Sequence, residues 1–167
     1  VSSIILRYFN VAGADKKNRS GLITNPDNLI KAVCEVAVGK RQELIINGND
    51  YNTKDGTTIR DYIHVSDLAE MHILAAENLM KKNLTKIYNC GYGVGFSIGD
   101  VVGSMNKILN KNIKIKYGPR RVGDAEYSVS DNTKFLNEFN WSPKMNKLDK
   151  ILTTSLNWEK MIEKIFN

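Results

Sequence analysis

Three places in the sequence carry side chains suited to binding an anion. In the stretch 48–69, G-N-D-Y-N-T-K-D-G-T-T-I-R-D-Y-I-H-V-S-D-L-A, Arg60 and Tyr62 stand two residues apart. On a strand, side chains at that spacing project to the same side of the sheet. A guanidinium there can make a bidentate contact with a phosphate, and the phenol can add a hydrogen bond. A surface arginine beside an ordinary core tyrosine is the alternative interpretation.

The second place is the run Pro119-Arg120-Arg121-Val122-Gly123-Asp124. Paired arginines beside a glycine let both charge and backbone approach an anion. Asp124 could accept hydrogen bonds from ribose hydroxyls or orient an arginine. Taken alone, an arginine pair in a loop is more often simply solvated, so that alternative stays open.

The third place is Arg7-Tyr8-Phe9-Asn10, at the C-terminal end of a predicted apolar strand. Ligands of open α/β sheets collect at that edge of the sheet. Asn10 can donate and accept hydrogen bonds at once, which suits sugar hydroxyls. A core aromatic pair followed by a turn asparagine would explain the same residues.

Two further patterns are weaker. His64 and His72 have no cysteine or carboxylate at ligand spacing, so we interpret both as structural and predict no metal site. The loop 91–95 has glycine at alternate positions but lacks the third glycine of the dinucleotide fingerprint. It is a weak candidate for a phosphate-binding loop.

The elements that must position these residues alternate between strand and helix, which indicates an α/β fold. In the first half we predict a strand at 3–9, a polar loop at 10–26, a helix at 28–38 ending at Gly39, a strand at 43–47, a turn-rich excursion at 48–57, a strand at 62–65, and a helix capped by Ser66 that runs to about Met80. In the second half we predict a strand at 86–90, a helix at 98–109 with a capping box from Ser97 and Asp100, a strand at 113–117, a polar basic segment at 118–130, and helices at 133–139 and 148–165.

Composition narrows the class of protein. The 167 residues are 42% hydrophobic and 25% charged, as in one globular domain, and the net charge of +6 suits an anionic partner. We predict no nucleic-acid binding, because basic and aromatic residues do not interleave on a strand. No apolar run approaches the roughly 20 residues of a membrane span. Cys34 and Cys90 are predicted to be buried, reduced thiols, although sequence alone leaves a disulfide open.

Taken in order, several segments resemble the UDP-glucose 4-epimerases, which are extended short-chain dehydrogenases/reductases. The segments cover nearly the whole chain: L-R-Y-F-N-V-A-G-A, N-L-I-K-A-V, A-V-G-K-R, the stretch 48–69, Y-N-C-G-Y-G-V-G-F-S-I and R-R-V-G-D. The most specific part is D-Y-x-T-x-D-G-T before R-D-Y-I-H-V. Related sugar-nucleotide epimerases and dehydratases look similar around R-D-Y but lack that insertion.

The resemblance implies that residues 1–167 are a C-terminal, substrate-binding half. Family members run to roughly twice this length, and their first half holds a glycine-rich dinucleotide loop and a catalytic Tyr-x-x-x-Lys pair. No tyrosine in this sequence is followed four residues later by lysine. We therefore expect the last strand or strands of an NAD-binding Rossmann-type sheet, a small mixed α/β substrate-binding domain, and no catalytic residue on this chain.

The resemblance also assigns roles to matching positions. Phe9 would lie against the nicotinamide side of NAD. The remaining positions would bind the UDP-sugar: Asn10 at the sugar, Asn28 and Leu29 at the start of their helix, Ile45 and Asn47 beside the uracil, and Arg60, Arg121 and Asp124 at the diphosphate and ribose with Tyr62 beside them.

Two positions depart from the family or vary within it. Lys31 stands where the family often has proline. Ser128 stands where a bulky side chain restricts the sugar pocket in the family, so our hypothesis is that it leaves room for N-acetylated sugars.

The implied function of the whole enzyme is interconversion of UDP-glucose and UDP-galactose by NAD-dependent oxidation and reduction at carbon 4. We expect a cytoplasmic protein and a homodimer for the whole enzyme, but do not extend the dimer to this segment alone. The alternative is a truncated, non-catalytic remnant with at most residual UDP binding. Because the first strand would normally lie within a larger sheet, poor solubility of the isolated segment is also predicted.

Overall fold

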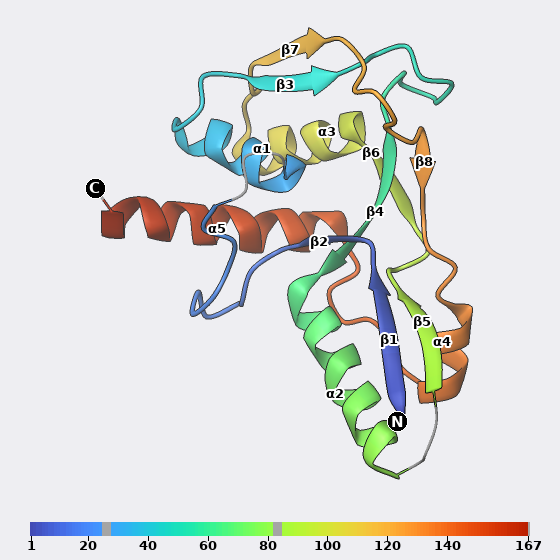
Figure 1. The fold of residues 1–167 in the computed structure, drawn as a ribbon. Coiled ribbons are helices and arrows are strands. Elements are labelled where there is room, and N and C mark those ends of the chain that lie inside the picture. Colours follow the sequence, from blue (N-terminus) through green and yellow to red (C-terminus); the bar gives the residue numbers. More distant parts are fainter. Residues whose placement is uncertain (25–27, 82–84, 167) are drawn as a thin grey trace.

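The computed structural model describes residues 1–24, 28–81 and 85–166, and strands alternate with helices along the chain (Figure 1). The elements are β1 (Ser3–Tyr8), β2 (Asn10–Ala12), α1 (Leu29–Val38), β3 (Leu44–Asn47), β4 (Ile59–His64), α2 (Val65–Lys81), β5 (Thr85–Cys90), β6 (Gly95–Ser97), α3 (Ile98–Leu109), β7 (Ile115–Gly118), β8 (Tyr127–Ser128), α4 (Thr133–Phe139) and α5 (Leu148–Phe166). The α/β class predicted from the sequence is confirmed.

The strands form three small sheets in which parallel pairing dominates. β1 pairs with β5 and β3 pairs with β7, both in parallel. β4 joins β2 and β8 in parallel and β6 antiparallel. In Figure 1, α2 and α4 lie at the end of the molecule that holds β1 and β5, and α1, α3 and α5 lie beneath β3 and β7. Strand β4 runs between these two ends.

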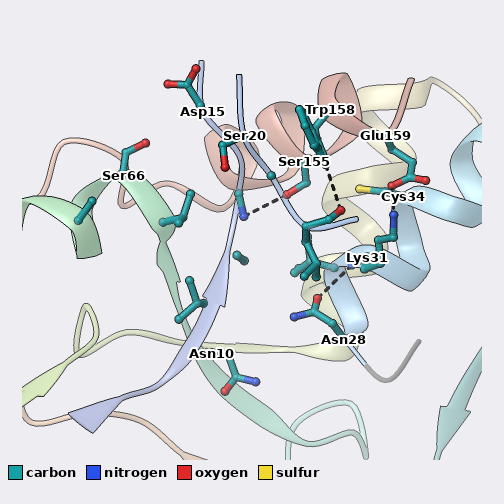
Figure 2. Close-up of a pocket in the computed structure, with 18 of the residues that line it drawn as sticks. Asn10, Asp15, Ser20, Asn28, Lys31, Cys34, Ser66, Ser155, Trp158 and Glu159 are labelled. Carbon is teal, nitrogen blue, oxygen red and sulfur yellow. Dashed lines mark hydrogen bonds and ion pairs between the residues drawn. The ribbon is translucent and has the colours of Figure 1, made fainter. Parts of the chain in front are cut away.

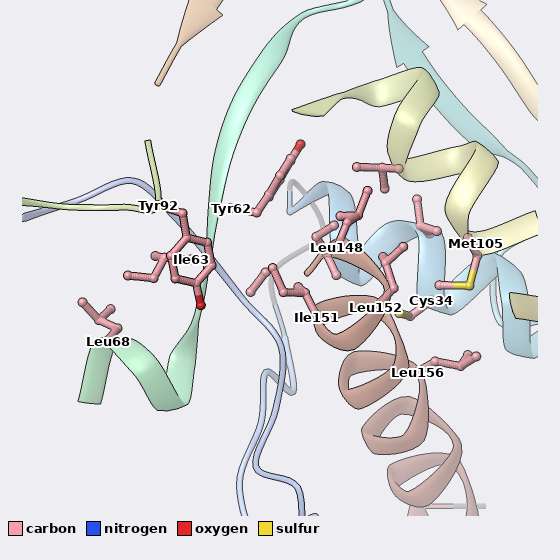
Figure 3. Close-up of a cluster of buried hydrophobic side chains, with 14 of the residues drawn as sticks. Cys34, Tyr62, Ile63, Leu68, Tyr92, Met105, Leu148, Ile151, Leu152 and Leu156 are labelled. Carbon is pink, nitrogen blue, oxygen red and sulfur yellow. The ribbon is translucent and has the colours of Figure 1, made fainter. Parts of the chain in front are cut away.

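A continuous apolar core joins the two ends (Figure 3). Ile151 and Leu152 of α5 are fully buried, and they lie close to Tyr62 of β4 and Met105 of α3. Burying an aliphatic side chain of this size contributes about 1.5–3 kcal/mol. The core therefore holds α5 against the elements that carry the predicted ligand-binding residues.

Several helix ends follow the local signals in the sequence. The Asn28 side chain caps α1 by accepting from the Lys31 N–H at 3.1 Å, and Gly39 ends the helix at φ +88°. Ser97 and Asp100 form the predicted capping box at the start of α3. The predicted helix end at Gly39 and the predicted capping box are confirmed, whereas Asn28, predicted as the first residue of its helix, is the cap.

The polar loop predicted at 10–26 is wrong in its first three residues. Asn10–Ala12 form β2, which pairs with β4 and not with the sheet of β1. The Phe9 N–H still bonds the Cys90 carbonyl at 3.1 Å, so the chain leaves one sheet at Phe9 and enters another at Asn10. The end of the predicted loop, at 25–26, lies outside the described residues.

The predicted cap of α2 is also wrong. The helix begins at Val65, which the sequence had placed in a strand, so Ser66 lies inside the first turn. The Ser66 N–H instead donates to Nδ1 of His64 at 3.1 Å. The imidazole of the preceding strand residue thus takes the place of a serine hydroxyl at this helix start.

One face of the β1–β5 sheet is open. Ile5 and Ile87 are Cα partners across the two strands, and they are 48% and 43% exposed. Of the described helices, none combines the length and the apolar character that crossing a bilayer requires.

Candidate functional site

A cavity of about 610 Å³ lies where β3, β4 and the start of α1 approach the loop after β7. Its wall includes nine of the residues to which the sequence assigned a ligand: Asn10, Asn28, Leu29, Ile45, Asn47, Arg60, Tyr62, Arg121 and Asp124. The volume lies within the range typical of small-molecule sites, about 300–1,000 Å³. Residues distant in sequence therefore meet at one hollow.

Arg60 and Tyr62 reach the cavity from the same side of β4. The Arg60 guanidinium donates to the carbonyl of Ile59 at 2.8 Å through Nη1 and pairs with the Asp124 carboxylate through Nη2. Tyr62 is almost wholly buried, and burial raises the pKa of its phenol despite the nearby Arg60 charge. Its hydroxyl therefore stays protonated and can donate.

Arg121 enters the cavity from the loop that follows β7. With the Asn47 amide oriented so that its oxygen faces the arginine, that oxygen accepts from Nε at 2.9 Å and from Nη2 at 3.3 Å. Asn47 ends β3, and the neighbouring Gly48 N–H bonds the Gly118 carbonyl at 2.9 Å. Each of the two guanidinium groups is thus oriented by an oxygen of another cavity residue.

A third arginine on the wall, Arg41, has no role in the sequence prediction. Its Nη2 lies 2.8 Å from Glu35 of α1. Arg41 lies in the segment A-V-G-K-R that contributes to the family resemblance, but a basic residue after a helix gives no sign of which way it points. Further unpredicted wall residues are Ala32, Leu44, Thr58 and Ile98. Three guanidinium groups against the Asp124 carboxylate leave the cavity suited to an anion.

Asn10 and Asn28 also border a second cavity, of about 940 Å³, between α1, α5 and the loop after β2 (Figure 2). On its wall, Lys31 pairs with Glu159 at 2.6 Å, and Lys40 reaches the same carboxylate at 3.0 Å. Cys34 lies beside this pair as a free, buried thiol. Burial, with the charge of Glu159, raises the pKa of Cys34 to about 12, so the thiol is unreactive near neutral pH.

Phe9 and Ser128 do not lie on the wall of the 610 Å³ cavity. Phe9 is half-buried at the crossing between β1 and β2, next to Asn10. Ser128 is half-buried on β8, where its Cα partner across the strands is Arg60. Both are neighbours of cavity residues.

Asp61, between the two predicted ligand residues of β4, has a positioning role that the sequence did not reveal. Its carboxylate is fully buried and accepts from the N–H groups of Tyr92 and Gly93, both at 2.9 Å, and from the Ser130 hydroxyl at 2.6 Å. The glycine-rich loop 91–95 therefore does bind an anion, but that anion is part of the protein. Its interpretation as a phosphate-binding loop is wrong.

The two histidines are engaged in hydrogen bonds within the protein. Nε2 of the fully buried His64 lies 3.0 Å from the Thr154 hydroxyl, and its Nδ1 accepts from Ser66. His72 bonds the Tyr8 hydroxyl at 2.7 Å and the Leu68 carbonyl at 2.8 Å. These contacts agree with the structural role predicted for both residues.

Comparisons with known proteins identify the family of this chain. Residues 1–91 match the model of the NAD dependent epimerase/dehydratase family. A UDP-glucose 4-epimerase from Azospirillum brasilense is 43% identical over 162 residues, which cover 96% of this chain and 47% of the relative.

Solved structures of similar proteins match almost the whole chain. A UDP-glucose 4-epimerase from Stenotrophomonas maltophila, with bound NAD and formylated UDP-arabinopyranose, gives a TM-score of 0.94 at 30% identity and covers 99% of this chain and 49% of its own. The UDP-Glc/GlcNAc 4-epimerase of Campylobacter jejuni gives 0.78 at 42% identity, over 96% of this chain and 49% of its own. The chain thus spans about half the length of the proteins that it matches. From these matches we conclude that the chain belongs to the NAD dependent epimerase/dehydratase family.

Proposed function

We propose that this chain is the nucleotide-sugar-binding half of a UDP-glucose 4-epimerase. The observation that carries the proposal is that Arg60 and Arg121, from segments far apart in sequence, border one cavity. Two guanidinium groups at one hollow suit a diphosphate, which each can bind through two parallel hydrogen bonds. The likeness to UDP-glucose 4-epimerases over nearly the whole chain supports this choice of ligand.

The wall divides into parts suited to different portions of a UDP-sugar. Asp124 holds Arg60 and can turn an oxygen to the ribose hydroxyls, while Ile45 and Asn47 at the end of β3 would flank the uracil. The N-terminus of α1, at Asn28 and Leu29, borders the cavity, so the positive end of the helix dipole lies at this wall. Asn10 would contact the sugar.

The proposal includes NAD, which when bound would supply the hydride chemistry at carbon 4 of the sugar. On this chain the resemblance assigns to NAD one residue, the half-buried aromatic Phe9 beside Asn10. A flat apolar ring next to the residue assigned to the sugar fits a nicotinamide contact. This half would bind UDP and hold it while the 4-keto sugar turns.

We also propose that the whole enzyme accepts N-acetylated sugars, because Ser128 is small and lies across from Arg60. The 42% identical Campylobacter jejuni protein is named a UDP-Glc/GlcNAc 4-epimerase, which supports this extension. Replacing Ser128 by tyrosine in the whole enzyme should lower turnover of UDP-N-acetylgalactosamine and spare that of UDP-galactose. An equal effect on the two substrates would exclude this role.

Calorimetric titration of UDP into the 167-residue chain tests the binding proposal. Replacing Arg60 by glutamine should raise the dissociation constant at least tenfold, because a hydrogen bond to a charged group is worth about 1.5–3 kcal/mol. Arg7→Gln, an exposed arginine on β1 that borders neither cavity, is the matched control. No UDP binding, or equal losses in the two variants, would overturn the proposal.

The chemistry is tested by adding the N-terminal half of the Azospirillum brasilense relative to this chain in trans. Conversion of UDP-galactose that depends on both halves is the expected result. A chain that binds UDP but supports no turnover with that half or as a fused full-length protein would instead be the non-catalytic remnant.

A further inference from the structure

The turn-rich segment 48–57, which holds the most specific part of the family resemblance, borders neither cavity although the structure describes all of it. It packs instead against the loop 119–126, which carries Arg121 and Asp124. We infer that Tyr51 and Arg120 are positioning residues that clamp this loop so that its two ligand-binding side chains face the cavity. The ligand in question is the UDP of the proposed function, on which that part of the inference rests.

Arg120 is held on one side by the ring of Tyr51 and on the other by Asp50. The Arg120 guanidinium carbon lies 4.2 Å from the centroid of the Tyr51 ring, within cation–π range. Its Nε donates to the Asp50 carboxylate at 2.6 Å, and its Nη2 bonds the Asp50 carbonyl. Arg120 also holds the pKa of Asp50 below its ordinary value, so the pair stays charged near neutral pH. These contacts of Arg120 position the next residue, Arg121, at the cavity wall.

The excursion is a firm support because it is tied to α3. Asp55 accepts from the N–H and hydroxyl of Thr57 at 2.9 and 2.8 Å and from the Ser97 hydroxyl at 2.5 Å. The Thr57 hydroxyl in turn accepts from the Ile98 N–H at 3.1 Å. Asp55 and Thr57 therefore bind the start of α3. The Tyr51 N–H bonds the Gly56 carbonyl at 3.0 Å, which connects Tyr51 to this anchored turn.

The loop is held again at its far end, whereas its tip at Val122 and Gly123 is open. The Asn52 N–H donates to the Glu126 carboxylate at 2.8 Å, and the Ile59 N–H bonds the Glu126 carbonyl at 2.9 Å. Val122 is fully exposed, and a side chain added at Gly123 would meet no atom within 4 Å. The two anchors therefore add to the contacts of Arg121 with Asn47 and of Asp124 with Arg60 in fixing these two side chains.

The ring of Tyr51, not its hydroxyl, makes the clamp. Tyr51 is 6% exposed, and its buried hydroxyl has no hydrogen-bond partner among the described residues. A Cβ on Gly48 would lie 2.6 Å from the Tyr51 ring and 2.8 Å from Cγ of Arg120, so the bare backbone at Gly48 is what lets the two stack. Phenylalanine should therefore replace Tyr51 without loss.

The test compares Arg120→Met, Tyr51→Leu and Tyr51→Phe in the 167-residue chain by two readouts. The first needs no ligand: it is the rate of tryptic cleavage after Arg121, within the clamped loop. The second is the UDP dissociation constant. Lys54→Met, which removes an exposed charge from the same excursion, is the matched control.

Arg120→Met and Tyr51→Leu should raise the cleavage rate about fivefold or more and the dissociation constant by a similar factor. Tyr51→Phe and Lys54→Met should match the wild type in both, and the melting temperature of Arg120→Met should hold because its side chain is 46% exposed. Unchanged loop cleavage in Arg120→Met, or a defect in Tyr51→Phe equal to that of Tyr51→Leu, would overturn the clamp. A wild type that binds no UDP while cleavage follows the expected order would remove the proposed function and leave the clamp in place.

Discussion

Replacing Glu159 by methionine breaks a buried ion pair between α1 and α5. Glu159 is 1% exposed and Lys31 is 6% exposed, with 2.6 Å between their charged atoms. Removing one partner of such a pair leaves the other charge buried and costs about 3–5 kcal/mol. Glu35, whose carboxylate lies 3.9 Å from Nζ of Lys31, compensates in part. We therefore expect a loss near the lower end of that range.

The double variant separates charge burial from side-chain packing. Lys31→Met alone leaves Glu159 paired with Lys40, which is 33% exposed. Because the carboxylate keeps this partner, we expect the free energy of unfolding to fall by about 1–3 kcal/mol. Lys31→Met with Glu159→Met removes both buried charges and retains apolar volume. The loss of stability in the double variant should then be smaller than the sum of the two single losses, by about 1–3 kcal/mol.

Urea unfolding followed by circular dichroism measures these differences. With a slope of about 2 kcal/mol per molar urea, a loss of about 3 kcal/mol lowers the midpoint by about 1.5 M. Lys160→Met and Glu163→Met on the same helix are the matched controls, and Lys160 is exposed. Strict additivity of Lys31→Met and Glu159→Met would refute the reasoning, because it would mean that the two charges do not stabilise each other.

Three other predictions concern residues that shape the site. Burial lowers the pKa of His64, so the neutral imidazole contributes its full share to the free energy of unfolding above the unfolded pKa of 6.5. That share is lost as pH falls below 6.5, by up to about 1.4 kcal/mol per pH unit. Urea unfolding at pH 7.5 and 5.5 should show this loss, and the same loss in His64→Gln would contradict the assignment to His64. Gly91→Ala brings a Cβ within 2.4 Å of the Asp61 carboxylate, so thermal unfolding should show a loss of about 1–3 kcal/mol, whereas Gly103→Ala, in open space on α3, should stabilise. Thr57→Val removes the hydroxyl that caps α3 and should lower stability by about 1–2 kcal/mol in the same assay, and an unchanged melting temperature would count against that role.

The helices could be predicted because their signals are local. Gly39, Ser97 and Asp100 each act within one turn of the helix end that they mark. The first sheet crossing could not be predicted in this way. Whether Asn10–Ala12 pair with β1's sheet or with β4 depends on a strand about fifty residues away, and a three-residue strand has too little pattern to reveal its partner.

The sequence predicted most of the residues that meet at the cavity, but not the residues that hold them in place. Arg60 and Arg121 carry a charge and a neighbouring glycine or tyrosine that mark them in the sequence, and the family resemblance adds their roles. Arg41 and Asp61 carry charges that look no different from surface charges. Only the fold reveals that one faces the cavity and that the other occupies the amides of the 91–95 loop.

Helix α1 links the two cavities, and this gives the buried ion pair a meaning beyond stability. Asn28 caps α1 and borders both cavities, so any slide or rotation of the helix moves the residues that face the proposed diphosphate. An apolar contact between α1 and α5 would tolerate such a shift, because dispersion and burial are not directional. A lysine that must meet one buried carboxylate at 2.6 Å tolerates it far less. Burying the charges of Lys31 and Glu159 is unfavourable, and we explain its retention by the fixed position that the pair gives to the start of α1.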